Sequence, residues 1–189
     1  HGLREICDFY DSLLIFDEVI TGFRLSLKGA RELYNVEPDL ITFGKIIGGG
    51  LPCGAVAGKN EIMQYLAPQG SVFQAGTMSG NPVVMSAGFA AIKKLSENPG
   101  YYIYLESLSE KLEKGLIEIF SDHKLTFCIN RVGSMLTVFF GVDRVENFEM
   151  AKMSDLNLFR LFAEHMIKNQ IYIPPSQFEA LFFSVAHNE

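Results

Sequence analysis

The fold of this chain is decided by Asp39-Leu-Ile-Thr-Phe-Gly-Lys-Ile-Ile-Gly-Gly-Gly-Leu-Pro52, a short apolar run that ends in glycine and lysine. Residues 40–43 predict a buried strand, because an apolar run of this length is bounded by a charged residue and a glycine. The run Leu13-Leu-Ile-Phe16 ends in Asp17-Glu18 in the same way, and residues 55–57 form a third short run. We expect one mostly parallel sheet with polar groups emerging at the carboxyl ends of its strands.

Helical patterns alternate with these strands. Apolar spacing predicts a helix over residues 3–10. Asn60 is expected to cap a helix that runs to Leu66, and Asn81 with Pro82 supplies an N-cap and an N1 proline for a helix ending near Leu95. Strands that alternate with helices predict an α/β layer.

A turn-rich segment at residues 97–100 separates two unlike halves. Residues 1–95 hold 13 of the 17 glycines, so the first half is expected to carry the functional site. Residues 96–189 predict an α+β domain. Its expected elements are helices over 101–119 and from Ser154 onward, and strands over 125–129 and 136–140.

Composition excludes several classes of protein. The 16 Lys and Arg against 22 Asp and Glu give a net charge of −6 without a basic stripe, so nucleic acid is not an expected partner. No apolar run approaches the roughly 18 residues of a membrane span. Histidines and cysteines lack metal-ligand spacing, so no metal is expected. Cys7, Cys53 and Cys128 are few and far apart, which favours a reducing, cytoplasmic location.

Lys45 is the first candidate catalytic residue. It follows a predicted strand, lies among apolar residues and glycines, and has no carboxylate beside it in sequence. Desolvation there would favour the neutral amine, which is the nucleophile that forms Schiff bases. The alternative is an ordinary surface lysine, because lysines are rarely buried.

Asp17 supplies a complementary group. It lies at the carboxyl end of its predicted strand, the edge where open α/β sheets bind ligands. A lysine amine, and an acid that keeps a pyridine nitrogen protonated, are together what pyridoxal phosphate chemistry needs. Alternatively, Asp17 caps a loop and pairs with Arg24.

The loop Gln74-Ala-Gly-Thr-Met-Ser-Gly-Asn-Pro82 precedes a predicted helix. Backbone amides, the Thr77 hydroxyl and a helix N-terminus can together bind a phosphate. A simple N-cap explains the same residues equally well.

Three motifs, at residues 14–24, 39–52 and 74–82, closely resemble the class III pyridoxal phosphate-dependent aminotransferases of fold type I. The resemblance runs from end to end of the chain. Members of that family are much longer at the N-terminus. The resemblance therefore implies that residues 1–95 are the C-terminal part of a large α/β cofactor-binding domain and that residues 96–189 are a small α+β domain.

The resemblance also implies roles for individual residues. Lys45 would hold the cofactor as a Schiff base, and Asp17 would bind its pyridine nitrogen. Val19 would pack against the face of the ring. Gly76 and Thr77 would bind the cofactor phosphate across the interface of a homodimer with shared active sites.

The closing segments at residues 174–180 and 184–187 favour the family branch that moves an amino group within one molecule. The implied activity is the isomerisation of glutamate 1-semialdehyde to 5-aminolevulinate in tetrapyrrole synthesis. Glu179 is expected near the substrate amino groups, with a solvated turn residue as the alternative. Two other hypotheses stay open: an ω-aminotransferase, and a chain that by itself only packs or dimerises.

Overall fold

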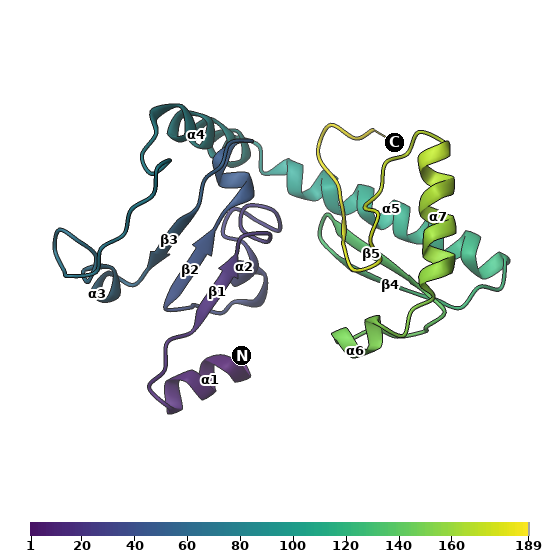
Figure 1. The fold of residues 1–189 in the computed structure, drawn as a ribbon, viewed down its shortest axis with the longest axis horizontal. Coiled ribbons are helices and arrows are strands. Elements are labelled where there is room, and N and C mark those ends of the chain that lie inside the picture. The colour runs from purple at the N-terminus through teal and green to yellow at the C-terminus, as the bar shows by residue number, and fades with distance from the viewer. Residues whose placement is uncertain (189) are drawn as a thin grey trace. The chain divides into compact units, whose positions relative to one another are not determined.

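The computed structural model describes residues 1–188 and divides the chain into two compact units, His1–Pro99 and a second unit from Gly100 onward. The first unit contains α1 (Gly2–Phe9), β1 (Ile15–Glu18), α2 (Ala30–Tyr34), β2 (Leu40–Phe43), the 3-10 helix η1 (Lys45–Gly48), β3 (Ala55–Gly58), α3 (Asn60–Met63) and α4 (Pro82–Glu97) (Figure 1). The second contains α5 (Gly100–Asp122), β4 (Phe127–Val132), β5 (Met135–Phe140), α6 (Phe148–Ala151), α7 (Leu156–Lys168) and β6 (Leu181–Phe182).

The sheet of the first unit has the order β1-β2-β3. β1 and β2 are parallel, with Asp17 opposite Thr42, whereas β2 and β3 are antiparallel. The sheet is therefore mixed. A parallel pair needs a long crossover, and residues 44–54 between β2 and β3 supply only η1 and a turn. β1 also begins two residues later than the sequence predicted, so that Asp17 and Glu18 are part of the strand.

The buried carboxylate of Asp39 links the elements at the amino end of β1 and β2. Asp39, which precedes β2, accepts hydrogen bonds from Arg4 at 2.7 Å and from the Leu14 backbone N–H at 2.7 Å, and it pairs with Lys59 at 2.6 Å. Hydrogen bonds from Lys59 and Arg4 hold the pKa of the Asp39 carboxyl well below its usual value. The carboxylate thus links α1, β1 and the residue that follows β3.

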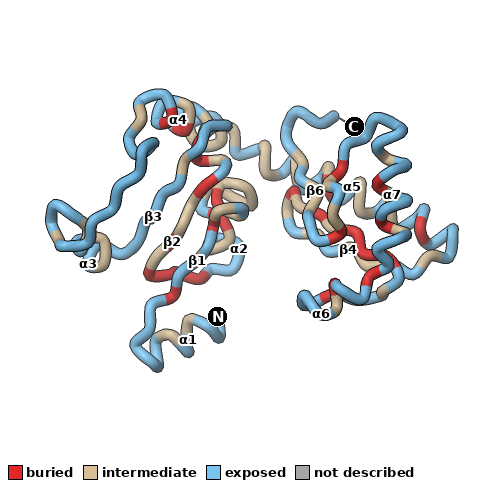
Figure 2. Tube along the Cα trace, viewed as in Figure 1, coloured by how far each residue is buried: buried red, intermediate tan, exposed pale blue. Residues whose placement is uncertain are grey.

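The first unit buries little of its apolar surface within itself. All four residues of β3 are exposed, and α4 buries only Val84 and Gly88 (Figure 2). Phe73 and Phe89 are 83% and 69% exposed. Asn81 caps α4 as predicted, accepting from two backbone N–H groups of the first turn, with Pro82 at N1.

The second unit has a denser core. β4, β5 and β6 form an antiparallel sheet in that order, and α5 and α7 contribute side chains to its core. The buried cluster consists of Phe120, Leu136, Val138, Phe140, Phe159, Ala163 and Ile173. At the end of α5, Ile119 is exposed and its neighbour Phe120 belongs to the buried cluster.

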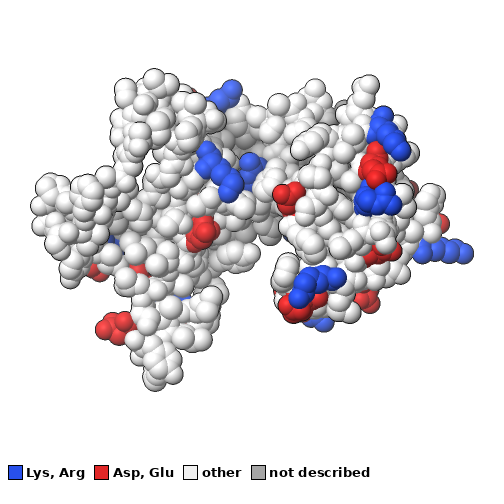
Figure 3. All heavy atoms as spheres, in the orientation of Figure 1, with Lys and Arg blue, Asp and Glu red and all other residues white. Residues whose placement is uncertain are grey.

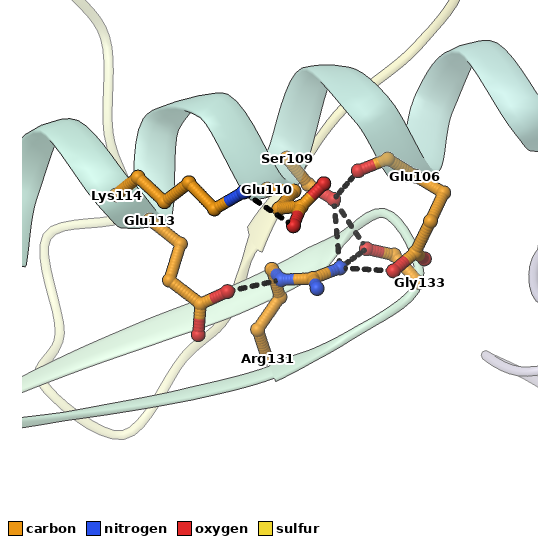
Figure 4. A network of polar contacts seen from close by, with 7 residues as sticks. All are labelled: Glu106, Ser109, Glu110, Glu113, Lys114, Arg131 and Gly133. Atoms are coloured by element: carbon orange, nitrogen blue, oxygen red, sulfur yellow. Dashed lines mark hydrogen bonds and ion pairs between the residues drawn. The ribbon is translucent and has the colours of Figure 1, made fainter.

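Arg131 joins α5 to β4 through a polar network (Figure 4). Its Nε donates to Glu113 and its Nη1 to Glu106, both at 2.6 Å, and Nη1 also reaches the Gly133 carbonyl at 3.3 Å. Ser109, fully buried, donates to the same carbonyl at 2.6 Å. Two carboxylates and a carbonyl therefore satisfy a guanidinium that is only 15% exposed.

Two predicted helix starts are wrong by one residue. α3 is capped by Lys59 rather than Asn60, and α7 by Asp155 rather than Ser154. Within residues 1–188, no helix is long and apolar enough to cross a membrane. On the face drawn in Figure 3, basic and acidic side chains lie beside one another over the second unit.

Candidate active site

The Asp17 carboxylate lies at the carboxyl end of β1. It is exposed, and its Oδ1 accepts the Val19 backbone N–H at 3.0 Å and the Thr42 hydroxyl at 3.4 Å. Within the described part of the chain, Oδ2 has no partner and Asp17 forms no ion pair, so the predicted alternative of pairing with Arg24 is not observed. The strand and its neighbour hold one oxygen and leave the other available to a ligand.

Glu18, the next residue, points the opposite way and is 1% exposed. Its carboxylate accepts a hydrogen bond from Thr21 and backbone N–H bonds from Ala30 and Arg31 at 2.9 and 3.0 Å. It therefore fixes the start of α2 against the end of β1. This role was not predicted from the sequence, although period-two alternation along the strand could have indicated it.

Lys45 is the first residue of η1. Gly44, between β2 and Lys45, is the N-cap of η1. Because β1 and β2 are parallel, their carboxyl ends bring Asp17 and Lys45 to the same edge of the sheet. The Lys45 side chain is exposed in this chain, and its amine has no hydrogen bond or ion pair with any described residue. Its φ of +48° is uncommon for a side chain other than glycine.

Val19 lies close to this lysine in the fold. A Cβ placed on Gly44 would come within 3.2 Å of Val19 Cγ1, so the glycine before Lys45 lets the valine approach the backbone. The structure thus gathers Asp17, Val19 and Lys45 at one end of β1 and β2.

The loop that contains Gly76 and Thr77 lies between α3 and α4, and both residues are exposed. Gly76 lines a hollow of about 620 Å³ together with Gln74 and Ser79 of its own loop and the segment 52–56. Asn81 occupies the first amides of α4, so the simple N-cap does exist. Among the described residues, the hydroxyl and the backbone N–H of Thr77 have no acceptor, which leaves them available to an anion.

Glu179 lies in the second unit, in a turn just before β6. Its backbone N–H donates to the Ser176 carbonyl at 3.2 Å, and its side chain is exposed. This matches the description of a solvated turn residue, and its predicted role near the substrate stays a prediction.

Asp17 and Lys45 thus lie at the carboxyl edge of a parallel strand pair, which is where open α/β sheets bind their ligands. The family model described as "Aminotransferase class-III" matches residues 1–169. The chain belongs to the class III aminotransferase family.

Among curated relatives, the glutamate-1-semialdehyde 2,1-aminomutases of Caldicellulosiruptor bescii and Clostridium kluyveri are 78% and 54% identical over 99% and 100% of this chain. The chain spans 44% and 45% of the lengths of these relatives.

Solved structures show the same fold. An ω-transaminase from Sphaerobacter thermophilus superimposes with a TM-score of 0.82 at 32% identity, covering 98% of this chain and 43% of that one. A glutamate-1-semialdehyde aminomutase from Pseudomonas aeruginosa in complex with PMP gives 0.84 at 22% identity, over 99% and 43% of the two chains. The predicted α/β fold of the class III aminotransferases is confirmed.

Proposed function

We propose that the full-length protein is a pyridoxal phosphate-dependent aminomutase that isomerises glutamate 1-semialdehyde to 5-aminolevulinate for tetrapyrrole synthesis. The observation that carries the proposal is the placement of Asp17 and Lys45 at one sheet edge. The 78% identity to a protein named as such an aminomutase supports this choice of substrate. Residues 1–95 would be the C-terminal part of the large cofactor-binding domain, and residues 96–189 the small domain.

The residues at this edge fit the cofactor. Pyridoxal phosphate, when bound, supplies a protonated pyridine ring that withdraws electrons from the carbon being deprotonated. The free oxygen of Asp17 would accept the ring N–H, and Val19 would give the ring an apolar face. Gly76 and Thr77 would bind the phosphate through the donors that the loop leaves unpaired.

Lys45 has the central chemical role. Its amine, free of any carboxylate within the described residues, would hold the cofactor between turnovers. During turnover it would carry protons between cofactor and substrate carbons as a general acid and base. Glu179 would lie near the substrate amino groups. These assignments make Lys45 and Asp17 the residues whose loss should abolish the reaction.

We further propose a cytoplasmic homodimer with shared active sites, in which Gly76 and Thr77 serve the partner's cofactor. The exposed apolar side chains of the first unit support an assembly larger than this chain. Cys7, Cys53 and Cys128 are free thiols, in keeping with a reducing compartment. The isolated 189-residue chain should be inactive, because an incomplete site lacks preorganisation.

The deciding experiment incubates the full-length protein with glutamate 1-semialdehyde and no external amino acceptor. Formation of 5-aminolevulinate is expected. Failure to form it would refute the aminomutase assignment. The second candidate, an ω-aminotransferase, has the support of the 32% identical ω-transaminase structure. It would instead form a keto product, and it would turn over repeatedly only when an amino acceptor is added to take the amino group.

Site assignment is tested by borohydride trapping with pyridoxal phosphate, followed by peptide mapping. The label is expected on Lys45 and lost in Lys45→Ala. Lys124→Ala is the matched control, because Lys124 is also exposed and has a φ of +54°. A label on another lysine would overturn the assignment.

A further inference from the structure

The backbone of the turn that carries Lys45 lies directly against α4. η1 begins at Lys45, and α4 packs on it. Ile47 in η1 and Val84 in α4 are both buried, so the contact is part of the small core of this unit. Position and direction of the Lys45 side chain therefore depend on how closely the helix approaches the turn.

Two glycines permit this approach, one from each side. A Cβ on Gly88 of α4 would lie 2.2 Å from the Ile47 carbonyl oxygen, and a Cβ on Gly49 would lie 2.4 Å from the Ala87 carbonyl oxygen. Both distances are far shorter than a carbon-oxygen contact allows, and both partners are backbone atoms that cannot rotate away. Gly49 also has a φ of +59°, which ends η1 in the left-handed region.

Gly88 has no evident reason to be a glycine apart from this contact. It lies in the interior of a 16-residue helix, where glycine costs stability relative to alanine. Its φ is not in the positive range that glycine favours. The cost is explained if the missing side chain is what lets α4 press on η1.

We propose that Gly88 is a positioning residue for Lys45: the close backbone contact of α4 with η1 holds the lysine turn in its left-handed start and fixes where the amine reaches. This inference rests on the proposed role of Lys45. An added methyl at Gly88 would push Ile47 and, through two peptide units, Lys45 itself. A misplacement of about 1 Å in a reacting group costs on the order of a hundredfold in rate.

The test compares Gly88→Ala with wild type in the full-length protein. The first readout is hydrogen exchange at residues 45–49 in cofactor-free protein, which is expected to be faster in the variant. The second is the rate at which pyridoxal phosphate becomes trappable by borohydride on Lys45, expected to fall tenfold or more, in the range that misplacement produces. The third is a fall in kcat with little change in KM.

Matched controls separate positioning from stability. Gly115→Ala makes the same change inside α5, where an added Cβ meets nothing within 4 Å. Val138→Ala lowers stability from the core of the other unit. Both are expected to keep wild-type exchange at residues 45–49 and wild-type trapping. Trapping by Gly88→Ala at the rate of the Val138→Ala variant would overturn the proposal.

A second pair covers the case in which Gly88→Ala does not fold. In Gly49→Asn the added side chain would meet the backbone of α4 at the same contact, from the side of η1. Asparagine tolerates the positive φ of this position. Gly50→Asn is its control, since Gly50 has a φ of +95° and open space around it. Faster exchange in Gly49→Asn alone supports the proposal, and equal exchange in both refutes it. If wild type takes up no cofactor on Lys45, the proposed function fails, while the exchange data still decide whether the contact holds the turn.

Discussion

Replacing Asp39 by asparagine should loosen the amino end of the first sheet. The carboxylate is 4% exposed and accepts bonds from Arg4 and the Leu14 N–H, both at 2.7 Å. Both bonds end on Oδ2, whereas Lys59 pairs with Oδ1. Asparagine can keep its amide oxygen toward Arg4 and Leu14, but without the charge, and it turns its NH2 group toward Lys59. A hydrogen bond to a charged group is worth roughly 1.5–3 kcal/mol and one to a neutral group roughly 0.5–1.5 kcal/mol, so the two bonds together lose up to about 3 kcal/mol. The half-exposed Lys59 returns to water at little cost. We expect a loss of about 3 kcal/mol in local stability.

Hydrogen exchange of the β1 and β2 amides in the full-length protein measures this loss, because it reports the free energy of local opening. A loss of about 3 kcal/mol corresponds to exchange roughly a hundredfold faster at pH 7. Glu37→Gln is the control. It removes an exposed pair with Arg31 at 3.2 Å and should change exchange less than about fivefold.

The pH dependence has a definite sign. The pKa of Asp39 is lower in the folded protein than in the unfolded chain, where it is about 4. The ionised carboxylate therefore stabilises the fold above that unfolded value, and the stabilisation is lost as the pH falls below it toward the folded pKa. The ratio of exchange rates between variant and wild type should be constant from pH 5 to 7 and shrink below about pH 4. An equal ratio at pH 3 and pH 7, or no change at pH 7, would refute the role given to Asp39.

Three further changes have expected outcomes. Arg131→Lys loses the planar guanidinium that pairs with two carboxylates, and it should lower the free energy of unfolding by about 1–3 kcal/mol in urea melts. The control Arg160→Lys, at an exposed pair, should change that free energy by less than about 0.5 kcal/mol. Leu136→Ala, at 1% exposure, should cost about 2–5 kcal/mol, whereas Ile103→Ala on the surface should cost under about 0.5 kcal/mol. Asn81→Ala removes a cap and should cost about 1 kcal/mol, seen as faster exchange in the first turn of α4; unchanged exchange would contradict this.

The bounds of an element were predicted correctly where neighbouring residues in the sequence determine them. β2 has the predicted bounds, and the cap at Asn81 begins α4 as expected. At Ser154 the local signal was ambiguous, because Asp155 beside it caps a helix equally well and is the residue used. The apolar run at residues 55–57 did not by itself show that β3 is antiparallel, since the direction of a strand follows from its connection to the preceding strand.

Tertiary contacts determine the features of the first unit that local sequence does not predict. The sequence indicates Asp39 only as the charged residue before a strand, and the fold shows that Arg4 and Lys59 converge on it. Gly88 lies in α4, and nothing in the sequence of that helix indicates that it packs against η1. Lys45 is exposed although Ile47, two residues on in η1, is buried, so apolar neighbours in sequence do not by themselves cover its amine.

Asp17 and Glu18 show how one step along a strand separates a supporting carboxylate from an available one. Successive side chains in β1 point to opposite faces, so the register that buries Glu18 also exposes Asp17. A buried carboxylate is costly unless donors surround it, and Thr21, Ala30 and Arg31 supply them. Those bonds fix the end of β1, because a slip of one residue would bury Asp17 without its donors. The buried, hydrogen-bonded carboxylate of Glu18 therefore fixes where the unpaired oxygen of Asp17 lies.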